Sequence, residues 1–193
     1  PLEPTPSSRG AVSQAGELAG RAGVPSGVTV MTLGPPSAED VLRESIAWGA
    51  ARGVDVDGIL VSDPAFAGSD TLATARALAA ALRREGPFDL ILTGRNSVDA
   101  DTGQVPPELA ELLDLPFLTG VRTLQLEGGR LRARCEHDDG WVDAQAELLV
   151  GLHRALLAGE EERALLDRVV FRQIVDLQDH VAWLGRLAHP GAG

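Results

Sequence analysis

A polar loop between an apolar strand and an amphipathic helix constrains this chain more than any other feature. Residues 88–93, Phe-Asp-Leu-Ile-Leu-Thr, form an apolar run of strand length. After residues 94–104, apolar side chains recur at helical spacing, at Val105, Leu109, Leu112 and Leu113. In an open α/β sheet, ligands bind beyond the carboxyl ends of the strands. The loop exceeds the usual connection of about 2–6 residues. Its pattern alone leaves two alternatives open, a binding site and an ordinary strand-to-helix connection.

The helix after the loop indicates what such a site would bind. Pro106 and Pro107 have no N–H to donate, so both fit only in the first turn of a helix that is capped near Gly103. First-turn amides could then receive an anion, and the glycines at both ends of the loop would allow its close approach. Asp99 and Asp101 could accept hydrogen bonds from ribose hydroxyls or cap neighbouring amides.

The loop and its helix resemble the nucleotide loop of the β subunit of electron transfer flavoproteins. The segment GRNSVDADTGQVPPELAE follows the family pattern G-[KR]-x-[AS]-x-D-x-D-x-x-Q-x-G-x-x-[LI]-A-E, with Pro107 at or beside a family glycine. The matching residues are Gly94, Arg95, Ser97, Asp99, Asp101, Gln104, Leu109, Ala110 and Glu111. The resemblance extends over about residues 28–148, and it implies that Leu33 lies near the adenine ring. The nucleotide-binding residues that it implies are Leu33, Gly94, Arg95, Asn96, Ser97, Val98, Asp99, Asp101, Thr102, Gly103, Gln104 and Val105.

The resemblance implies an electron carrier subunit rather than an enzyme. Such a β subunit pairs with an α subunit that holds most of the redox FAD, and it holds AMP or a second FAD itself. A flavin dehydrogenase supplies the electrons. Since the redox chemistry belongs to the flavin, no residue is expected to be catalytic. A regulatory or structural module that binds an adenine nucleotide without a redox role is the alternative, because the fold does not settle the function.

Strands alternate with helices around the loop. Expected strands cover residues 28–33, 59–61 and 88–93, and expected helices cover residues 38–51 and about 70–84. Ser37 would cap the first helix, and Ser69 or Asp70 the second. The alternation predicts a three-layer α/β domain over residues 28–148, with a parallel sheet and helices on both faces. Alternating residues and glycine turns from residue 121 to 148 predict a small antiparallel extension.

The two ends of the chain differ from this pattern. Residues 1–27 predict a flexible N-terminal arm, rich in Pro and Ser over its first ten residues, in which residues 11–22 could form a short helix. Residues 149–193 predict a helical C-terminal extension. An apolar seam with alternating steps of four and three runs through Val170, Ile174, Leu177, Val181, Leu184 and Ala188. It predicts one continuous helix over residues 165–188 that either packs on its own domain or docks a partner.

Composition and charge limit the partners and the compartment. The net charge of −11 argues against nucleic acid, which needs a basic face, and favours a partner with a basic patch. No apolar run approaches the roughly 20 residues of a membrane span, and residues 1–10 lack the apolar segment of a signal peptide. A single cysteine, Cys135, fits a reducing, cytoplasmic compartment. The four histidines are not spaced like metal ligands, so no metal site is expected.

Overall fold

The computed structural model describes residues 6–21, 26–95, 102–127, 130–147 and 181–187. Its helices are α1 (Pro6–Arg21), α2 (Glu39–Ala50), α3 (Thr71–Glu85) and α4 (Val105–Leu112), with two short 3-10 helices, η1 (Pro36–Ala38) and η2 (Pro64–Phe66). Its strands are β1 (Ser26–Leu33), β2 (Val56–Val61), β3 (Leu90–Leu92), β4 (Gly94–Arg95), β5 (Val121–Glu127), β6 (Arg130–His137), β7 (Gly140–Glu147) and β8 (Val181–Leu187).

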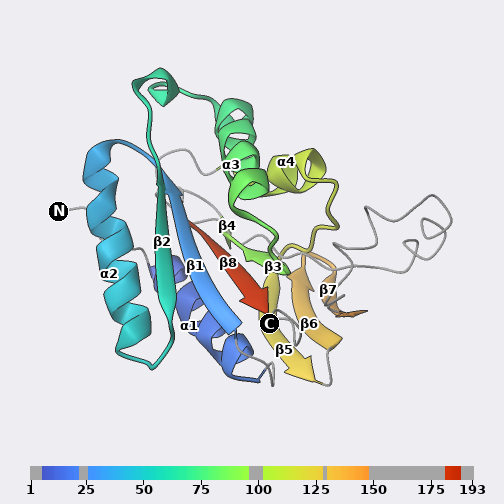
Figure 1. The fold of residues 1–193 in the computed structure, drawn as a ribbon. Coiled ribbons are helices and arrows are strands. Elements are labelled where there is room, and N and C mark those ends of the chain that lie inside the picture. The colour runs from blue at the N-terminus through green and yellow to red at the C-terminus, as the bar shows by residue number, and fades with distance from the viewer. Residues whose placement is uncertain (1–5, 22–25, 96–101, 128–129, 148–180, 188–193) are drawn as a thin grey trace, which may run out of the picture.

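The strands form two sheets (Figure 1). Within the described residues, one sheet has the order β2-β1-β8-β3 and the other has the order β5-β6-β7. β1 and β2 pair in parallel, as predicted, whereas β8 pairs antiparallel with both β1 and β3. β1, β2 and β3 therefore point the same way, and their carboxyl ends lie at one edge of the sheet. The prediction of a parallel sheet is wrong for β8, which makes the first sheet mixed.

β8 also corrects the expectation for the C-terminal residues. Residues 181–187 fall within the helix predicted over residues 165–188, but they form a strand inside the first sheet. Val181 and Leu184, two positions of the predicted seam, lie opposite Thr32 and Thr29 of β1. A strand between two others pairs its backbone groups on both sides, which favours this arrangement over an isolated helix end. The remainder of the predicted helical extension lies outside the described residues.

Alternate residues of β1 contribute to two apolar clusters. Val28 and Val30 belong to a first cluster with residues of α1, α2, β3, β5 and β6. Met31 and Leu33 belong to a second cluster with residues of α3 and α4. These four side chains are at most 5% exposed, and burying each stabilises the fold by about 1.5–3 kcal/mol. Successive side chains of a strand point to opposite faces. The two clusters therefore lie on opposite faces of β1.

α2 lies where a helix is predicted but has a different start. Its buried residues are Val41, Leu42, Ser45 and Gly49, whose spacing places them on one helical face. Ser37 is not its cap, because residues 36–38 form η1 and Ala38 becomes the N-cap residue, without a side-chain hydrogen bond. The prolines before Ser37 explain the difference, since Pro36 fits the first position of a short helix.

α1 replaces part of the predicted flexible arm. The helix begins at Pro6, so the expectation of an arm is wrong for residues 6–10, and the short helix expected from residue 11 starts earlier. A proline is tolerated there because the first N–H groups of a helix have no intrahelical partner. Val12 and Ala15 are buried in the first cluster, and the Trp48 Nε1 of α2 donates to Ser13 Oγ at 3.2 Å.

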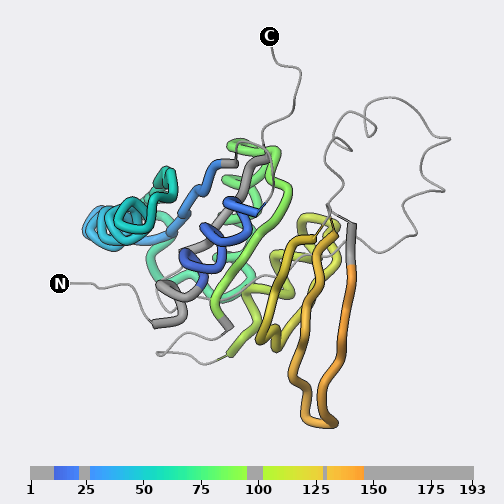
Figure 2. The backbone as a smooth tube through the Cα atoms, turned by 90° about the horizontal axis from the view of Figure 1, so that it is seen from below, coloured from blue at the N-terminus to red at the C-terminus, as the bar shows by residue number. Residues whose placement is uncertain are grey.

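The antiparallel extension forms as predicted. β6 pairs with β5 and β7, and its turn to β7 closes at His137 opposite Gly140. Leu131, Ala133 and Cys135 of β6 enter the first cluster, while the arginines between them are exposed. Figure 2 shows the β6–β7 end projecting away from the helices. The extension is therefore anchored to the first sheet by these alternate residues of β6 together with Leu124 and Leu126 of β5.

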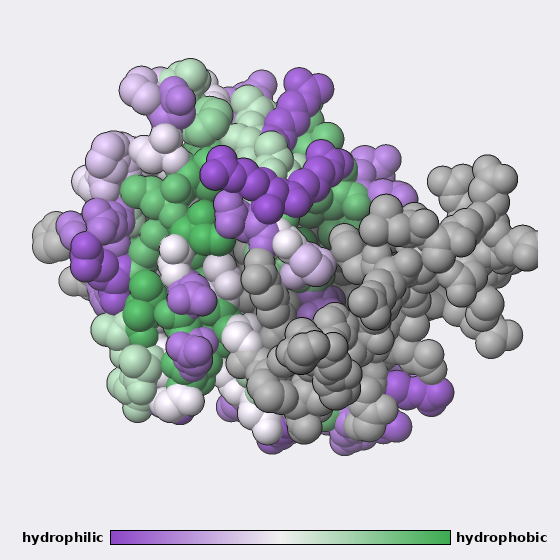
Figure 3. All heavy atoms as spheres, viewed as in Figure 1, coloured by the Kyte–Doolittle hydropathy of each residue, from purple (hydrophilic) through white to green (hydrophobic). Residues whose placement is uncertain are grey.

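The α3 face of the first sheet is incompletely covered over β2. Ile59 and Val61 of β2 and Phe66 of η2 pack against the second cluster but are only partly buried. Figure 3 shows apolar side chains gathered on this face over β1 and β2.

Candidate functional site

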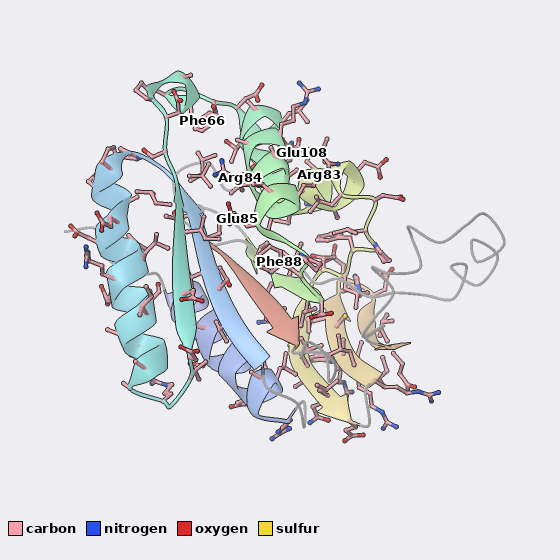
Figure 4. All side chains as sticks on the ribbon, viewed as in Figure 1. Phe66, Arg83, Arg84, Glu85, Phe88 and Glu108 are labelled. Atoms are coloured by element: carbon pink, nitrogen blue, oxygen red, sulfur yellow. The ribbon has the colours of Figure 1, made fainter. Side chains whose placement is uncertain are left out.

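The starts of α3 and α4 meet beside the carboxyl ends of the parallel strands. The Oγ1 atom of Thr71, the first residue of α3, lies 3.2 Å from the Oε1 atom of Gln104 and 3.2 Å from the Oε1 atom of Glu108. At the other end of both helices, the Arg83 Nη2 donates to the carbonyl oxygen of Leu112. The two helices therefore pack against each other with their N-termini together, and Figure 4 draws α4 beside α3.

One of the two residues predicted to cap α3 does so. The Asp70 side chain accepts a hydrogen bond from the Ala73 amide at 2.8 Å, so Asp70 is the cap and Ser69 is not. Such a cap fixes where a helix begins and contributes about 1 kcal/mol. It also fixes the position of Thr71, the next residue, which faces α4.

The two prolines lie in the first turn of α4, as predicted, and the cap lies one residue after Gly103. Pro106 and Pro107 lie in the first turn, and the N-cap residue is Gln104 rather than Gly103. Gly103 has a φ of 60°, in the left-handed region that favours glycine. The Thr102 Oγ1 accepts a hydrogen bond from the Gln104 amide at 3.4 Å. The chain thus turns into α4 through a conformation that few other residues adopt.

The first turn of α4 has fewer free amides than an ordinary helix. Its two prolines carry no N–H, and the Glu108 amide donates to the Gln104 carbonyl at 3.1 Å. Val105 is therefore the first-turn residue whose amide makes no hydrogen bond to another described residue. An anion placed here would meet one amide of this turn together with the partial positive charge of the helix end.

Glu108 is a functional candidate that the sequence analysis missed. One oxygen of its carboxylate, Oε1, contacts Thr71, whereas Oε2 is buried without a hydrogen-bond partner among the described residues. The single Thr71 proton cannot serve both Gln104 and Glu108. Turning the Gln104 amide, so that its Nε2 donates to Thr71 Oγ1, lets Thr71 donate to Glu108. The partial positive charges at the starts of α3 and α4 also stabilise the carboxylate.

The structure describes seven of the twelve residues predicted to bind the nucleotide. Leu33 ends β1 at the same edge and is buried in the second cluster, against which Val105 also packs. Gly94 and Arg95, the first two residues of the predicted loop, form the short strand β4, and Gly94 is buried. Thr102, Gly103 and Gln104 lead into α4 as described. Five predicted residues lie outside the described residues: Asn96, Ser97, Val98, Asp99 and Asp101.

The described ranges of the chain contain no group of three or more His, Cys, Asp or Glu residues that could hold a metal ion. They also contain no helix whose length and apolar character would allow it to cross a membrane.

Comparison with known proteins identifies the family. The family model described as "Electron transfer flavoprotein domain" matches residues 2–151. The electron transfer flavoprotein subunit beta of Thermoanaerobacterium thermosaccharolyticum is 43% identical over 114 residues, which cover 59% of this chain and 42% of that protein. The protein FixA of Azotobacter vinelandii is 53% identical over 97 residues, covering 49% of this chain and 33% of that protein.

A third relative covers more of the chain. The acryloyl-CoA reductase electron transfer subunit gamma of Anaerotignum propionicum is 38% identical over 144 residues, covering 74% of this chain and 51% of that protein. The chain thus spans about half or less of the length of these relatives. The family match covers well over half of the chain itself, and it includes the whole loop between β3 and α4. The chain therefore belongs to the electron transfer flavoprotein β-subunit family.

Proposed function

We propose that this chain is a β-like subunit of an electron transfer flavoprotein that binds an adenine nucleotide between β3 and α4. With an α subunit it would carry electrons from a flavin dehydrogenase to an acceptor. One observation carries the proposal: the segment of residues 94–111, which resembles the family's nucleotide loop, follows β3 and leads into α4 at the edge where the parallel strands β1 and β2 also end. This is the edge at which α/β sheets bind ligands.

The residues of this edge suit AMP or the AMP half of FAD. The left-handed turn at Gly103 and the Val105 amide would receive phosphate at the start of α4. Leu33 ends β1 at the same edge, in the position proposed for the adenine side. Asp99 and Asp101 would orient the loop and the ribose rather than bind a metal. When bound, a flavin supplies the redox chemistry, and the chain's own residues bind and orient it.

The proposal also covers the architecture, the location and the partners expected of this family. A three-layer domain, with helices on both faces of its sheet, is supported by the two clusters that share β1. A cytoplasmic location and the absence of a nucleic-acid partner are supported by the single cysteine and the net charge of −11. The main FAD is proposed to lie chiefly with the α subunit.

The test is the visible spectrum of the full chain co-expressed and co-purified with an electron transfer flavoprotein α subunit. We expect a yellow complex whose flavin absorption is bleached by dithionite and by a reduced flavin dehydrogenase. The α subunit purified alone is the control, and it should retain less flavin or transfer electrons more slowly. A colourless complex that releases AMP or ATP on denaturation would instead support the non-redox nucleotide-binding module.

A further inference from the structure

We propose that Glu108 makes the nucleotide site selective for nucleotides of low phosphate charge. The inference rests on the proposed function, because it requires a phosphate at the start of α4. Glu108 lies in the first turn of that helix, where it is a fixed negative charge. It would therefore oppose each further negative charge that a ligand brings to the same place.

The position of Glu108 in α4 directs its carboxylate toward the proposed phosphate site. Glu108 follows Val105 by three residues, so both lie on the same helical face. Helical side chains also lean toward the N-terminus of their helix, which brings the carboxylate toward the Val105 amide. Thr71 holds one oxygen of the carboxylate at 3.2 Å. The charge is therefore held in place by α3 and cannot swing freely into solvent.

The surroundings of Glu108 strengthen its field. Its Oε2 atom is buried, and among the described residues it accepts no hydrogen bond. Water therefore screens this carboxylate less than it would screen an exposed one, and its repulsion of a nearby anion is larger. Because the first turn of α4 also contains two prolines, this turn itself offers few amides to offset that repulsion. The arrangement favours a monophosphate over a triphosphate.

The experiment compares adenosine, AMP and ATP by calorimetry on the full chain, in a buffer with EDTA. E108Q removes the charge and keeps the size of the side chain. We expect its affinity for ATP relative to AMP to rise about tenfold, since a like charge nearby is removed, while its affinity for adenosine stays unchanged. D114N is the matched control. Asp114 is exposed beyond the other end of α4 and has a φ of 55°, which asparagine tolerates.

Each outcome separates this inference from the proposed function. A ratio of ATP to AMP affinity that does not change in E108Q overturns the inference alone, as does an equal loss of affinity for all three ligands. If E108Q fails to fold, T71V tests the same point, because it frees the carboxylate and should shift the ratio in the same direction. An unchanged ratio in T71V would then overturn the inference. A wild-type chain that binds none of the three ligands overturns both the inference and the nucleotide site.

Discussion

Gly103 is the residue on which the backbone of the proposed phosphate site depends most directly. Its φ of 60° costs an L residue with a side chain roughly 1–2 kcal/mol, and a branched side chain would also stand where a phosphate approaches. We expect G103V to lower AMP affinity by about tenfold or more, roughly 1.4 kcal/mol, as measured by calorimetry.

A second glycine controls for backbone strain at Gly103. Gly53 has a φ of 73° in the turn after α2, and a Cβ atom there would meet nothing within 4 Å. G53V should therefore lose stability for the same reason but keep its AMP affinity. If G103V bound AMP as tightly as the wild type, the proposed position of the phosphate at this turn would be wrong.

The sequence was sufficient to find some residues of the site and not others. Gly103, the two prolines and Asp70 act through neighbours within four positions, so local rules for turns and helix starts predicted them. The contact between Thr71 and Glu108 joins residues 37 positions apart, and it exists only because α3 and α4 lie side by side. Glu108 did carry one local signal, since acids are favoured in the first turn of a helix, but that signal does not distinguish a cap from a site.

Helices and strands were predictable where the apolar residues followed a single spacing, either helical or alternating. The strand at β1, the buried face of α2 and the alternating strands β5 to β7 each followed one clear pattern. β8 did not, because residues 181–187 fit both a helical seam and a strand, and only its place between β1 and β3 decides. α1 was missed at its start because prolines and serines are common both in flexible segments and in first turns of helices.

The place of β8 in the sheet predicts how it tolerates proline. Leu184 lies opposite Thr29 of β1 and Ile91 of β3, so L184P disrupts the ladder in the middle of the strand. We expect a loss of about 1–3 kcal/mol in the free energy of unfolding, measured by urea denaturation. L187P is the control, because Leu187 ends the strand opposite Ser26. If both variants were as stable as the wild type, β8 would not be a central strand.

The first cluster joins the two sheets into one core. Cys135 of β6 is 1% exposed and packs in the same cluster as Val28 of β1 and Leu92 of β3. Gln14 of α1 adds a polar link, since its Nε2 donates to the carbonyl oxygen of Leu124 in β5 at 3.1 Å. The antiparallel extension should therefore unfold together with the rest of the described domain rather than as a separate unit.

Cys135 gives this joint core a distinctive response to alkaline pH. Burial, and secondarily the Asp143 carboxylate, raises the pKa of the Cys135 thiol above its usual value near 9.0. The folded chain therefore holds this proton to higher pH than the unfolded chain does. The resulting stabilisation is complete below the pKa of the thiol in the unfolded chain. It is lost as the pH rises through the pKa of the thiol in the folded chain. Because the sequence contains no lysine or tyrosine, Cys135 is the only side chain that titrates between the histidines and the arginines.

The free energy of unfolding, measured by urea denaturation from pH 7 to 10.5, tests this response. We expect it to fall above about pH 9, with a slope of at most about 1.4 kcal/mol per pH unit. C135A should be less stable at neutral pH, because it leaves a small cavity, but it should lack this alkaline slope. The terminal amine is common to both proteins and cancels in the comparison. Parallel curves for the two proteins would show that the thiol does not titrate with folding, and that the junction between the sheets is open to water at Cys135.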